Sequence, residues 1–243
     1  MAESTYSRGL AVTDSRVSSP PRHSAVVRVT HWLTVLAFFG LVFSGIAILL
    51  AHPRLYWGET GAVGAPSLID LSLPFVRDVP IRGPGRYLHF LSAWVCVLTG
   101  AFYVLFGLIS GHFRRDLMPS RDTFRIAHVV QLISNHLRLR RPGEEDALSY
   151  NILQRFTYLA VVFLVLPSII WTGLAMSPAI TSVAPGLATV LGGQQSARTI
   201  HFFLAFLLLL FFIVHIAMVF LAGFVDRVRP MITGRISSVK EHV

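Results

Sequence analysis

Four histidines lie within long apolar segments of this 243-residue sequence, where a polar imidazole is costly. They are His31, His89, His201 and His215. His201 and His215 share one segment and are fourteen positions apart. In an α-helix fourteen residues rise ~21 Å and return to within ~40° of the starting direction. One face of a single helix therefore offers an imidazole near each side of a membrane.

The segment that carries His201 and His215 is one of four that are apolar enough to cross a membrane. The 27 residues between Arg198 and Asp226 contain no Asp, Glu, Lys or Arg, whereas about 20 residues span a ~30 Å hydrocarbon core as a helix. The composition agrees, since 53% of residues are hydrophobic, 14% are charged and mean hydropathy is +0.63. We expect spans at about 29–51, 87–111, 156–178 and 199–224, with a kink at Pro167.

The sequence thus predicts an all-α membrane protein that folds as a bundle of four transmembrane helices. Residues 28–226 form the expected membrane domain. Residues 1–27 lack apolar periodicity and are expected to be a mobile N-terminal tail, and residues 227–243 are expected to be a C-terminal tail.

The distribution of Lys and Arg predicts which side of the membrane each loop faces. Residues 1–30 contain 4 of these cations, 114–155 contain 8 and 226–243 contain 4. The loop at 52–86 contains 4 and the loop at 177–198 contains 1. Because cytoplasmic loops carry the excess, we expect both termini and the middle loop in the cytoplasm and the protein in a bacterial inner membrane. The 52–86 loop then faces outward as the natural docking surface for an external partner.

Matching the histidines by depth pairs His89 with His201 near the outer face and His31 with His215 near the cytoplasm. A lone metal ion would need more ligands, whereas haem brings four nitrogens of its own and needs two axial imidazoles. The pattern predicts two stacked b-type haems with two histidine ligands each, suited to electron transfer. The alternative is a haem-free transporter or membrane anchor in which the histidines form a metal or proton path.

An Arg precedes a histidine by three residues at three span entries, and the three are Arg28, Arg86 and Arg198. This spacing puts both side chains on nearly the same helical face, from which a guanidinium can reach a haem propionate with a charge-assisted hydrogen bond. Each Arg could instead mark the membrane boundary. Glycines in the spans would let a flat macrocycle approach the backbone or let helices pack closely; they are Gly40, Gly45, Gly100, Gly107 and Gly173.

The other residues exclude several function classes. Cys96 is the only cysteine, so the chain alone cannot build a disulfide, a Cys-rich zinc site or an iron–sulfur cluster. The net charge of +9 fits a basic cytoplasmic face on membrane lipid, and no basic stretch is interleaved with stacking aromatics, so we expect no nucleic acid. Six further histidines fall in loops, tails or helix ends: His23, His52, His112, His128, His136 and His242.

With the four histidines, Arg28-Val-Thr-His31-Trp32 and Ser44-Gly45 in place, the chain resembles a family of four-helix di-haem cytochrome b subunits. These are of the formate dehydrogenase gamma, NiFe-hydrogenase and thiosulfate reductase type and are related to bacterial cytochrome b561. The resemblance covers about residues 25–235. It implies a quinone site beside the cytoplasmic-side haem, formed partly by a Tyr-Asn-x-x-Gln-Lys/Arg motif.

That motif here reads Tyr150-Asn151-Ile152-Leu153-Gln154-Arg155. The resemblance implies that Asn151 and Gln154 contact a quinone head group near His215. The chain departs from the formate dehydrogenase pattern at Leu153, where that pattern has a glycine. Asn151 could alternatively cap the third helix.

Three further stretches are similar to the thiosulfate-reductase-like branch, namely residues 56–61, 111–115 and 172–176. The resemblance implies an extracytoplasmic molybdopterin oxidoreductase as partner. We therefore expect an electron-transfer subunit of a respiratory complex, which relays electrons in either direction between that partner and quinone. Candidate proton donors to the quinone site are His112, Arg114 and His136. The alternative is a stand-alone cytochrome b561-like enzyme that oxidises superoxide at an outer site lined by Arg82, Arg86 and Arg198.

Overall fold

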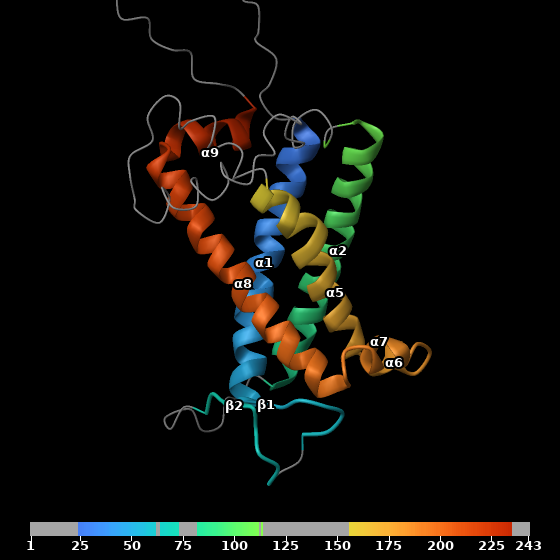
Figure 1. Ribbon diagram of the computed structural model, residues 1–243. Coiled ribbons are helices and arrows are strands. Elements are labelled where there is room, and N and C mark those ends of the chain that lie inside the picture. The colour runs from blue at the N-terminus through green and yellow to red at the C-terminus, as the bar shows by residue number, and fades with distance from the viewer. Residues whose placement is uncertain (1–23, 62–63, 73–81, 112, 114–155, 235–243) are drawn as a thin grey trace, which may run out of the picture.

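The computed structural model describes residues 24–61, 64–72, 82–111, 113 and 156–234. Within these residues four helices are long and apolar enough to cross a membrane (Figure 1). They are α1 (Ala25–Ala51), α2 (Arg82–Ile109), the segment Phe156–Ala175 and α8 (Gln194–Leu221). The prediction of a four-helix transmembrane bundle is confirmed.

The third span is not a uniform α-helix. It contains a π-helical turn, η3 (Val161–Val165), followed by α5 (Leu166–Ala175). Pro167 explains the irregularity, because it lacks an N–H and its ring clashes with the carbonyl four residues earlier, so the preceding turn widens. The span ends at Ala175 and not at the expected residue 178. Residue 178 is instead the first residue of the short helix α6 (Pro178–Thr181).

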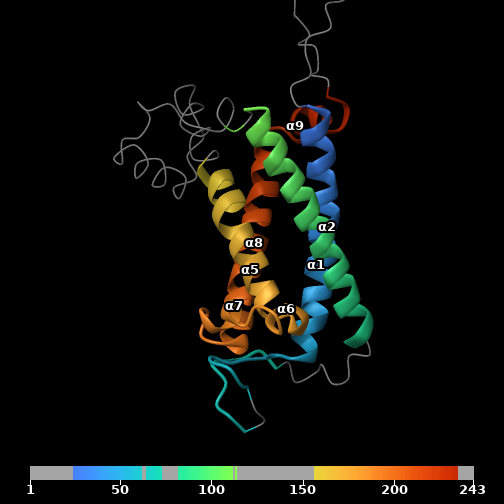
Figure 2. The ribbon, with the colours of Figure 1, turned by 90° about the vertical axis from the view of Figure 1, so that its right-hand side faces the viewer.

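The helices are arranged as two closely packed pairs, α1 with α2 and α5 with α8. Figure 2 shows the two pairs beside each other. Gly40 allows the close approach of α1 to α2, because a Cβ at this position would lie 2.3 Å from Ser92 Oγ. The space between the two pairs is where the histidines lie.

The buried hydrophobic cluster of the protein lies at the end of the bundle that carries two short strands, which we call the hairpin end (Figure 1). Strands β1 (Arg54–Leu55) and β2 (Ile69–Asp70) pair antiparallel, with Arg54 opposite Asp70. Helix α7 (Gly186–Thr189) also lies at this end. Ala175, Ala188 and Ala197 form a buried cluster there, which joins α5, α7 and α8.

The opposite end carries α9 (Phe224–Thr233), and we call it the α9 end. The sequence predicted a C-terminal tail from residue 227 onward, and this helix was not expected. Gly223 has φ +91°, a conformation that only glycine adopts readily, and it separates α9 from α8. The start of α1 lies at the same end (Figures 1 and 2), as an even number of spans requires.

Large apolar side chains are exposed along all four spans. Examples are Leu36 on α1, Leu91 on α2, Leu164 in the third span and Phe206 on α8. A soluble protein rarely exposes such continuous apolar surface. Together with the length of the helices, this surface makes the protein an integral membrane protein.

Candidate functional site

The structure brings the four histidines together in two pairs. The ring centroids of His89 on α2 and His201 on α8 lie 6.3 Å apart, and those of His31 on α1 and His215 on α8 lie 6.5 Å apart. These are the partners that depth matching predicted. An imidazole nitrogen lies ~2.0–2.1 Å from a metal ion that it binds. Two rings on opposite sides of one ion therefore have centres about 6 Å apart, close to both observed separations.

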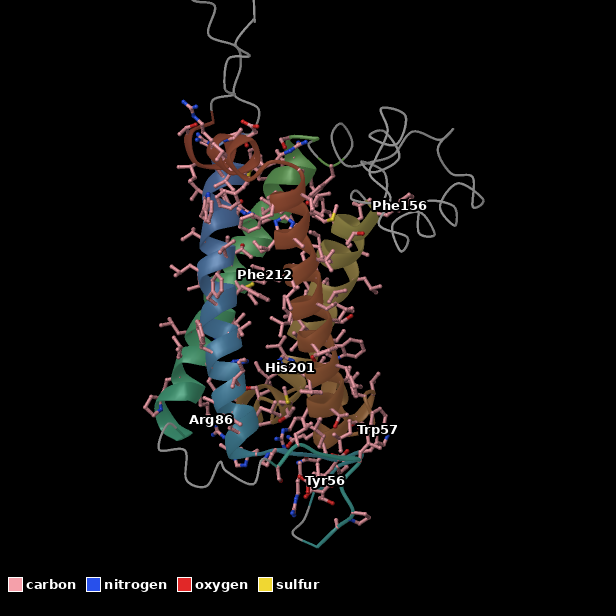
Figure 3. The ribbon with its side chains drawn as sticks, turned by 90° about the vertical axis from the view of Figure 1, so that its left-hand side faces the viewer. Tyr56, Trp57, Arg86, Phe156, His201 and Phe212 are labelled. Carbon is pink, nitrogen blue, oxygen red and sulfur yellow. The ribbon has the colours of Figure 1, made fainter. Side chains whose placement is uncertain are left out.

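Both pairs line one cavity of about 3830 Å³ between the helix pairs. A site for one drug-sized ligand measures about 300–1,000 Å³, so this cavity exceeds the need of a single small ligand several-fold. His201 points into this cavity near the hairpin end, and Phe212 lies between the two histidine pairs (Figure 3). Phe212 contacts Phe38 and Phe39 of α1, at centroid distances of 5.1 and 5.4 Å.

Two hydroxyl groups bond the histidines of the hairpin-end pair. Ser44 Oγ lies 3.0 Å from His89 Nδ1 and Thr172 Oγ1 lies 2.9 Å from His201 Nδ1. Each hydroxyl already donates its single hydrogen to a carbonyl of its own helix, Ser44 to Gly40 at 2.5 Å and Thr172 to Ile169 at 3.0 Å. With its hydrogen on the carbonyl, each hydroxyl accepts from the imidazole, and in this tautomer Nδ1 carries the proton and Nε2 keeps its lone pair.

His215 of the α9-end pair has a longer contact of this kind. Tyr158 in the third span places its hydroxyl 3.5 Å from His215 Nδ1. Phe211 stacks on the same imidazole, with a centroid distance of 5.9 Å. Trp32 meets the ring of His31 edge to face at 5.4 Å.

The donor set suits haem better than a bare metal ion. Among the described residues no three His, Cys, Asp or Glu side chains group together as a metal site would require. Each pair offers only two neutral imidazoles, whereas haem needs only two axial ligands. The spacing of the rings in both pairs, the Nε2 lone pairs of His89 and His201 and the size of the cavity all fit this group.

Two of the three predicted propionate arginines bond to backbone carbonyls at helix ends. Arg28 donates from Nη1 to Ile232 O on α9 at 2.9 Å, and Arg198 donates to His52 O at the end of α1. Arg86 is exposed and lines the cavity at the hairpin end. Their role toward a propionate stays a prediction.

The glycines of the spans differ in what surrounds them. Gly40 packs against Ser92, and a Cβ at Gly107 would lie 2.4 Å from the ring of Phe113. By contrast, Gly45 and Gly173 lie beside the imidazoles of His89 and His201 respectively, while a Cβ at Gly100 would meet no atom within 4 Å.

Sequence reasoning assigned no role to Ser44, Thr172 or Tyr158. Ser44-Gly45 and Thr172-Gly173 belong to motifs that carried the family resemblance, which was the available signal. Asn151 and Gln154, the predicted quinone residues, lie outside the described residues. The same holds for the candidate proton donors His112, Arg114 and His136.

Comparison with known proteins places this geometry in a family. Residues 22–234 match the family described as prokaryotic cytochrome b561, and this range contains all four spans and α9. A relative from Azospira oryzae is 29% identical over 197 residues, which cover 81% of this chain and 89% of that protein. It is named "Putative protein-methionine-sulfoxide reductase subunit YedZ1". No solved structure matches. The chain belongs to the prokaryotic cytochrome b561 family, a family of integral membrane proteins that bind b-type haem.

Proposed function

We propose that this protein is a di-haem electron-transfer subunit that connects a redox partner at the hairpin end with membrane quinone at the α9 end. His89 and His201 would hold one haem, and His31 and His215 the other. Held by two imidazoles in each pair, haem would supply one-electron oxidation and reduction and would offer no open position for oxygen. The proposal includes a bacterial inner-membrane location with the α9 end in the cytoplasm, which the excess of Lys and Arg in the loops at that end supports.

The observation that carries the proposal is that α8 supplies one imidazole to each pair. His201 and His215 are fourteen residues apart on this continuous helix, or ~21 Å along its axis. The partner rings come from α2 at the hairpin end and from α1 at the α9 end. One rigid helix therefore fixes two equivalent ligand positions at two depths, as transfer across a membrane needs.

The hairpin end offers a firmly held surface for a partner. The loop after β1 is fastened to the start of α8, because Gly58 N donates to Ser196 Oγ at 2.8 Å and Thr199 Oγ1 donates to Tyr56 O at 2.6 Å. Trp57, in the same loop, keeps 60% of its surface exposed (Figure 3). A fixed backbone that displays an exposed Trp suits protein docking, since aromatic residues are enriched in interfaces.

The partner at this end is proposed to be an extracytoplasmic molybdopterin oxidoreductase. The family resemblance supports this class, and the name of YedZ1 describes that relative as a reductase subunit. A Trp57→Ala variant should weaken binding of the partner while the haem content stays unchanged. Haem loss in this variant, or unchanged binding, would contradict a docking role for Trp57.

The quinone is proposed to bind at the α9 end, next to His215. The Tyr-Asn-x-x-Gln-Arg motif at residues 150–155 immediately precedes the third span, which begins at Phe156 at this end (Figure 3). Changing Asn151 or Gln154 to Ala should slow haem oxidation by quinone and leave both haems bound. Loss of a haem with normal quinone turnover in the remainder would contradict this assignment.

The first experiment is to count haems in the purified chain by a pyridine haemochrome assay. Two b-type haems per polypeptide are expected in the wild type and one in His201→Ala or His215→Ala. The pairing predicts that His89→Ala combined with His201→Ala still retains one haem, whereas His89→Ala combined with His31→Ala retains none. A colourless wild-type protein would refute the proposal and favour the transporter or anchor alternative.

The superoxide alternative is favoured by one observation, namely that Arg86 and Arg198 line the cavity at the hairpin end, where an anion could enter. A stand-alone enzyme would reduce quinone with superoxide without any partner. We expect the purified chain to lack this activity, and substantial turnover that is lost in Arg86→Gln would establish the alternative.

A further inference from the structure

Two dipeptides contact the hairpin-end imidazoles in the same way. Ser44-Gly45 lies on α1 beside His89 of α2, and Thr172-Gly173 lies on α5 beside His201 of α8. In each dipeptide the hydroxyl bonds Nδ1 of the imidazole. In each, the following glycine faces the ring edge, since a Cβ at Gly45 or Gly173 would lie 3.8 or 3.6 Å from the ring atom Cε1.

We propose that Ser44-Gly45 and Thr172-Gly173 are two equivalent hydroxyl–glycine cradles that set the tautomer and the electron donation of His89 and His201. Ser44 and Thr172 are the positioning residues, and Gly45 and Gly173 leave room for the Cε1–Nδ1 edge of each ring. This inference rests on the proposed role of His89 and His201 as axial ligands.

The hydroxyl acts by accepting the Nδ1 proton. Because its own hydrogen is used on a helix carbonyl, it cannot donate to the ring. This fixes the proton on Nδ1 and leaves the lone pair on Nε2. A bond of this kind also raises the basicity of a metal-binding imidazole, and a more basic ligand favours the oxidised iron.

The glycine acts by its lack of a side chain. A Cβ at Gly173 would lie 3.6 Å from Cε1 and 3.9 Å from Nδ1 of His201, and a Cβ at Gly45 would lie 3.8 and 4.0 Å from the same atoms of His89, so each glycine faces the ring edge that carries the hydroxyl bond. A methyl group at 3.6 Å from Cε1 is an ordinary van der Waals contact, and Ala should be accepted at Gly173. A branched side chain would extend further over this edge and push the imidazole away from the hydroxyl.

The arrangement is repeated in the two halves of the bundle. Each cradle lies on the first helix of a closely packed pair, α1 or α5, and its histidine lies on the second, α2 or α8. Both hydroxyls are buried, with exposed fractions of 2% for both Ser44 and Thr172, so water does not compete for the imidazole. The α9-end pair differs, because the hydroxyl bonded to His215 is a Tyr at 3.5 Å.

The test changes the hydroxyl without changing the shape of the side chain. In Thr172→Val the haem at His89 and His201 should stay bound, and its ratio of reduced to oxidised form at a fixed potential should rise about tenfold. Tenfold is the smaller of the effects that follow when a metal-binding histidine loses its hydrogen-bond partner. A tenfold change corresponds to an upward shift of about 59 mV for a one-electron couple. Ser44→Ala should shift the same haem in the same direction, and Thr172→Ser should restore the wild-type potential.

Ser168→Ala is the matched control. Ser168 lies on the same helix and donates to Leu164 O at 2.7 Å, just as Thr172 donates to its own helix, but it is only half-buried and the structure gives it no bond to an imidazole. This variant should leave both potentials unchanged. A second arm compares Gly173→Ala, which should keep both haems, with Gly173→Val, which should lose the outer one.

The outcomes separate this inference from the proposed function. If His201→Ala removes one haem but Thr172→Val and Ser44→Ala leave the potential of that haem unchanged, the cradle inference is wrong and the haem assignment stands. A shift of equal size in Ser168→Ala would likewise overturn it, because the effect would then be a general one on α5. If wild-type protein binds no haem at the hairpin end, the proposed function itself fails.

Discussion

The contact of Gly40 with Ser92 couples the packing of α1 on α2 to the hairpin-end histidine pair. A Cβ at Gly40 would lie 2.3 Å from Ser92 Oγ and 3.2 Å from Ser92 Cβ. Ser44 is one turn further along α1 and donates to Gly40 O, while His89 is three residues before Ser92 on α2. Any separation of α1 from α2 at Gly40 therefore lengthens the hydrogen bond between Ser44 and His89.

The Gly40→Ala substitution allows the helix separation and its cost in stability to be estimated. The shortest Cβ contacts in real structures are close to 3.0 Å, so the helices must separate by about 0.7 Å unless the Ser92 hydroxyl rotates away, and overpacking of this kind costs about 1–3 kcal/mol. The same displacement would stretch the bond between Ser44 Oγ and His89 Nδ1 beyond its present 3.0 Å, toward the limit of a hydrogen bond.

Thermal unfolding in detergent and redox titration of the haem proposed at His89 and His201 measure the two effects. Gly40→Ala should lower the unfolding midpoint and raise the outer haem potential, and adding Ser92→Gly should restore both because it removes both contact atoms. Gly100→Ala is the control, since its Cβ would meet nothing within 4 Å and the change should be neutral or slightly stabilising. Unchanged stability in Gly40→Ala, or no rescue by Ser92→Gly, would show that this contact does not couple helix packing to the histidine pair.

Three further predictions concern other parts of the chain. Arg28→Ala removes the bond to Ile232 O at the end of α9 and about 1 kcal/mol of helix-end stabilisation. Trypsin should therefore cleave α9 faster in this variant, while both haems remain bound. Loss of haem with α9 still protected from trypsin would instead favour a role of Arg28 in binding a propionate. The pKa of Asp70 is lowered by hydrogen bonds from Ser72, first through its side chain, and by Arg54, so its contribution to the hairpin is present above the ordinary pKa of 3.8 and is lost as pH falls through the lowered value. Hydrogen exchange of the hairpin should therefore accelerate in strong acid, and Asp70→Asn should be fast already at neutral pH; identical profiles would contradict this. Tyr158→Phe removes a contact of 3.5 Å to His215, so it should keep both haems and shift the inner potential less than Thr172→Val shifts the outer one.

Much of the architecture was predictable from the sequence because membrane thickness imposes strict limits. A helix that crosses ~30 Å needs about 20 apolar residues, and only four segments satisfy this among the described residues. The fixed rise of the helix then gives the depth of each histidine, so His201 was expected opposite His89 and His215 opposite His31. Depth depends only on position along the chain, which the sequence contains.

What the sequence could not provide was the rotation of each helix about its axis. Apolar residues surround these helices on all sides, so no amphipathic pattern indicates which face is inward. Among several hydroxyls in the spans, only the tertiary structure could therefore select Ser44 and Thr172 as partners of His89 and His201. The role of each glycine could not be predicted for the same reason. In the structure Gly40 serves helix packing, whereas Gly45 and Gly173 lie beside the imidazoles.

The membrane class, the four spans and the depths of the histidines follow from the amino-acid sequence, because composition and helical rise are local properties. Only the tertiary structure decided that Arg28 fastens α9 and that a buried hydroxyl meets an imidazole in each half of the bundle. These contacts join residues 29 to 204 positions apart. Such contacts depend on how the helices turn and pack against each other, which no single segment encodes.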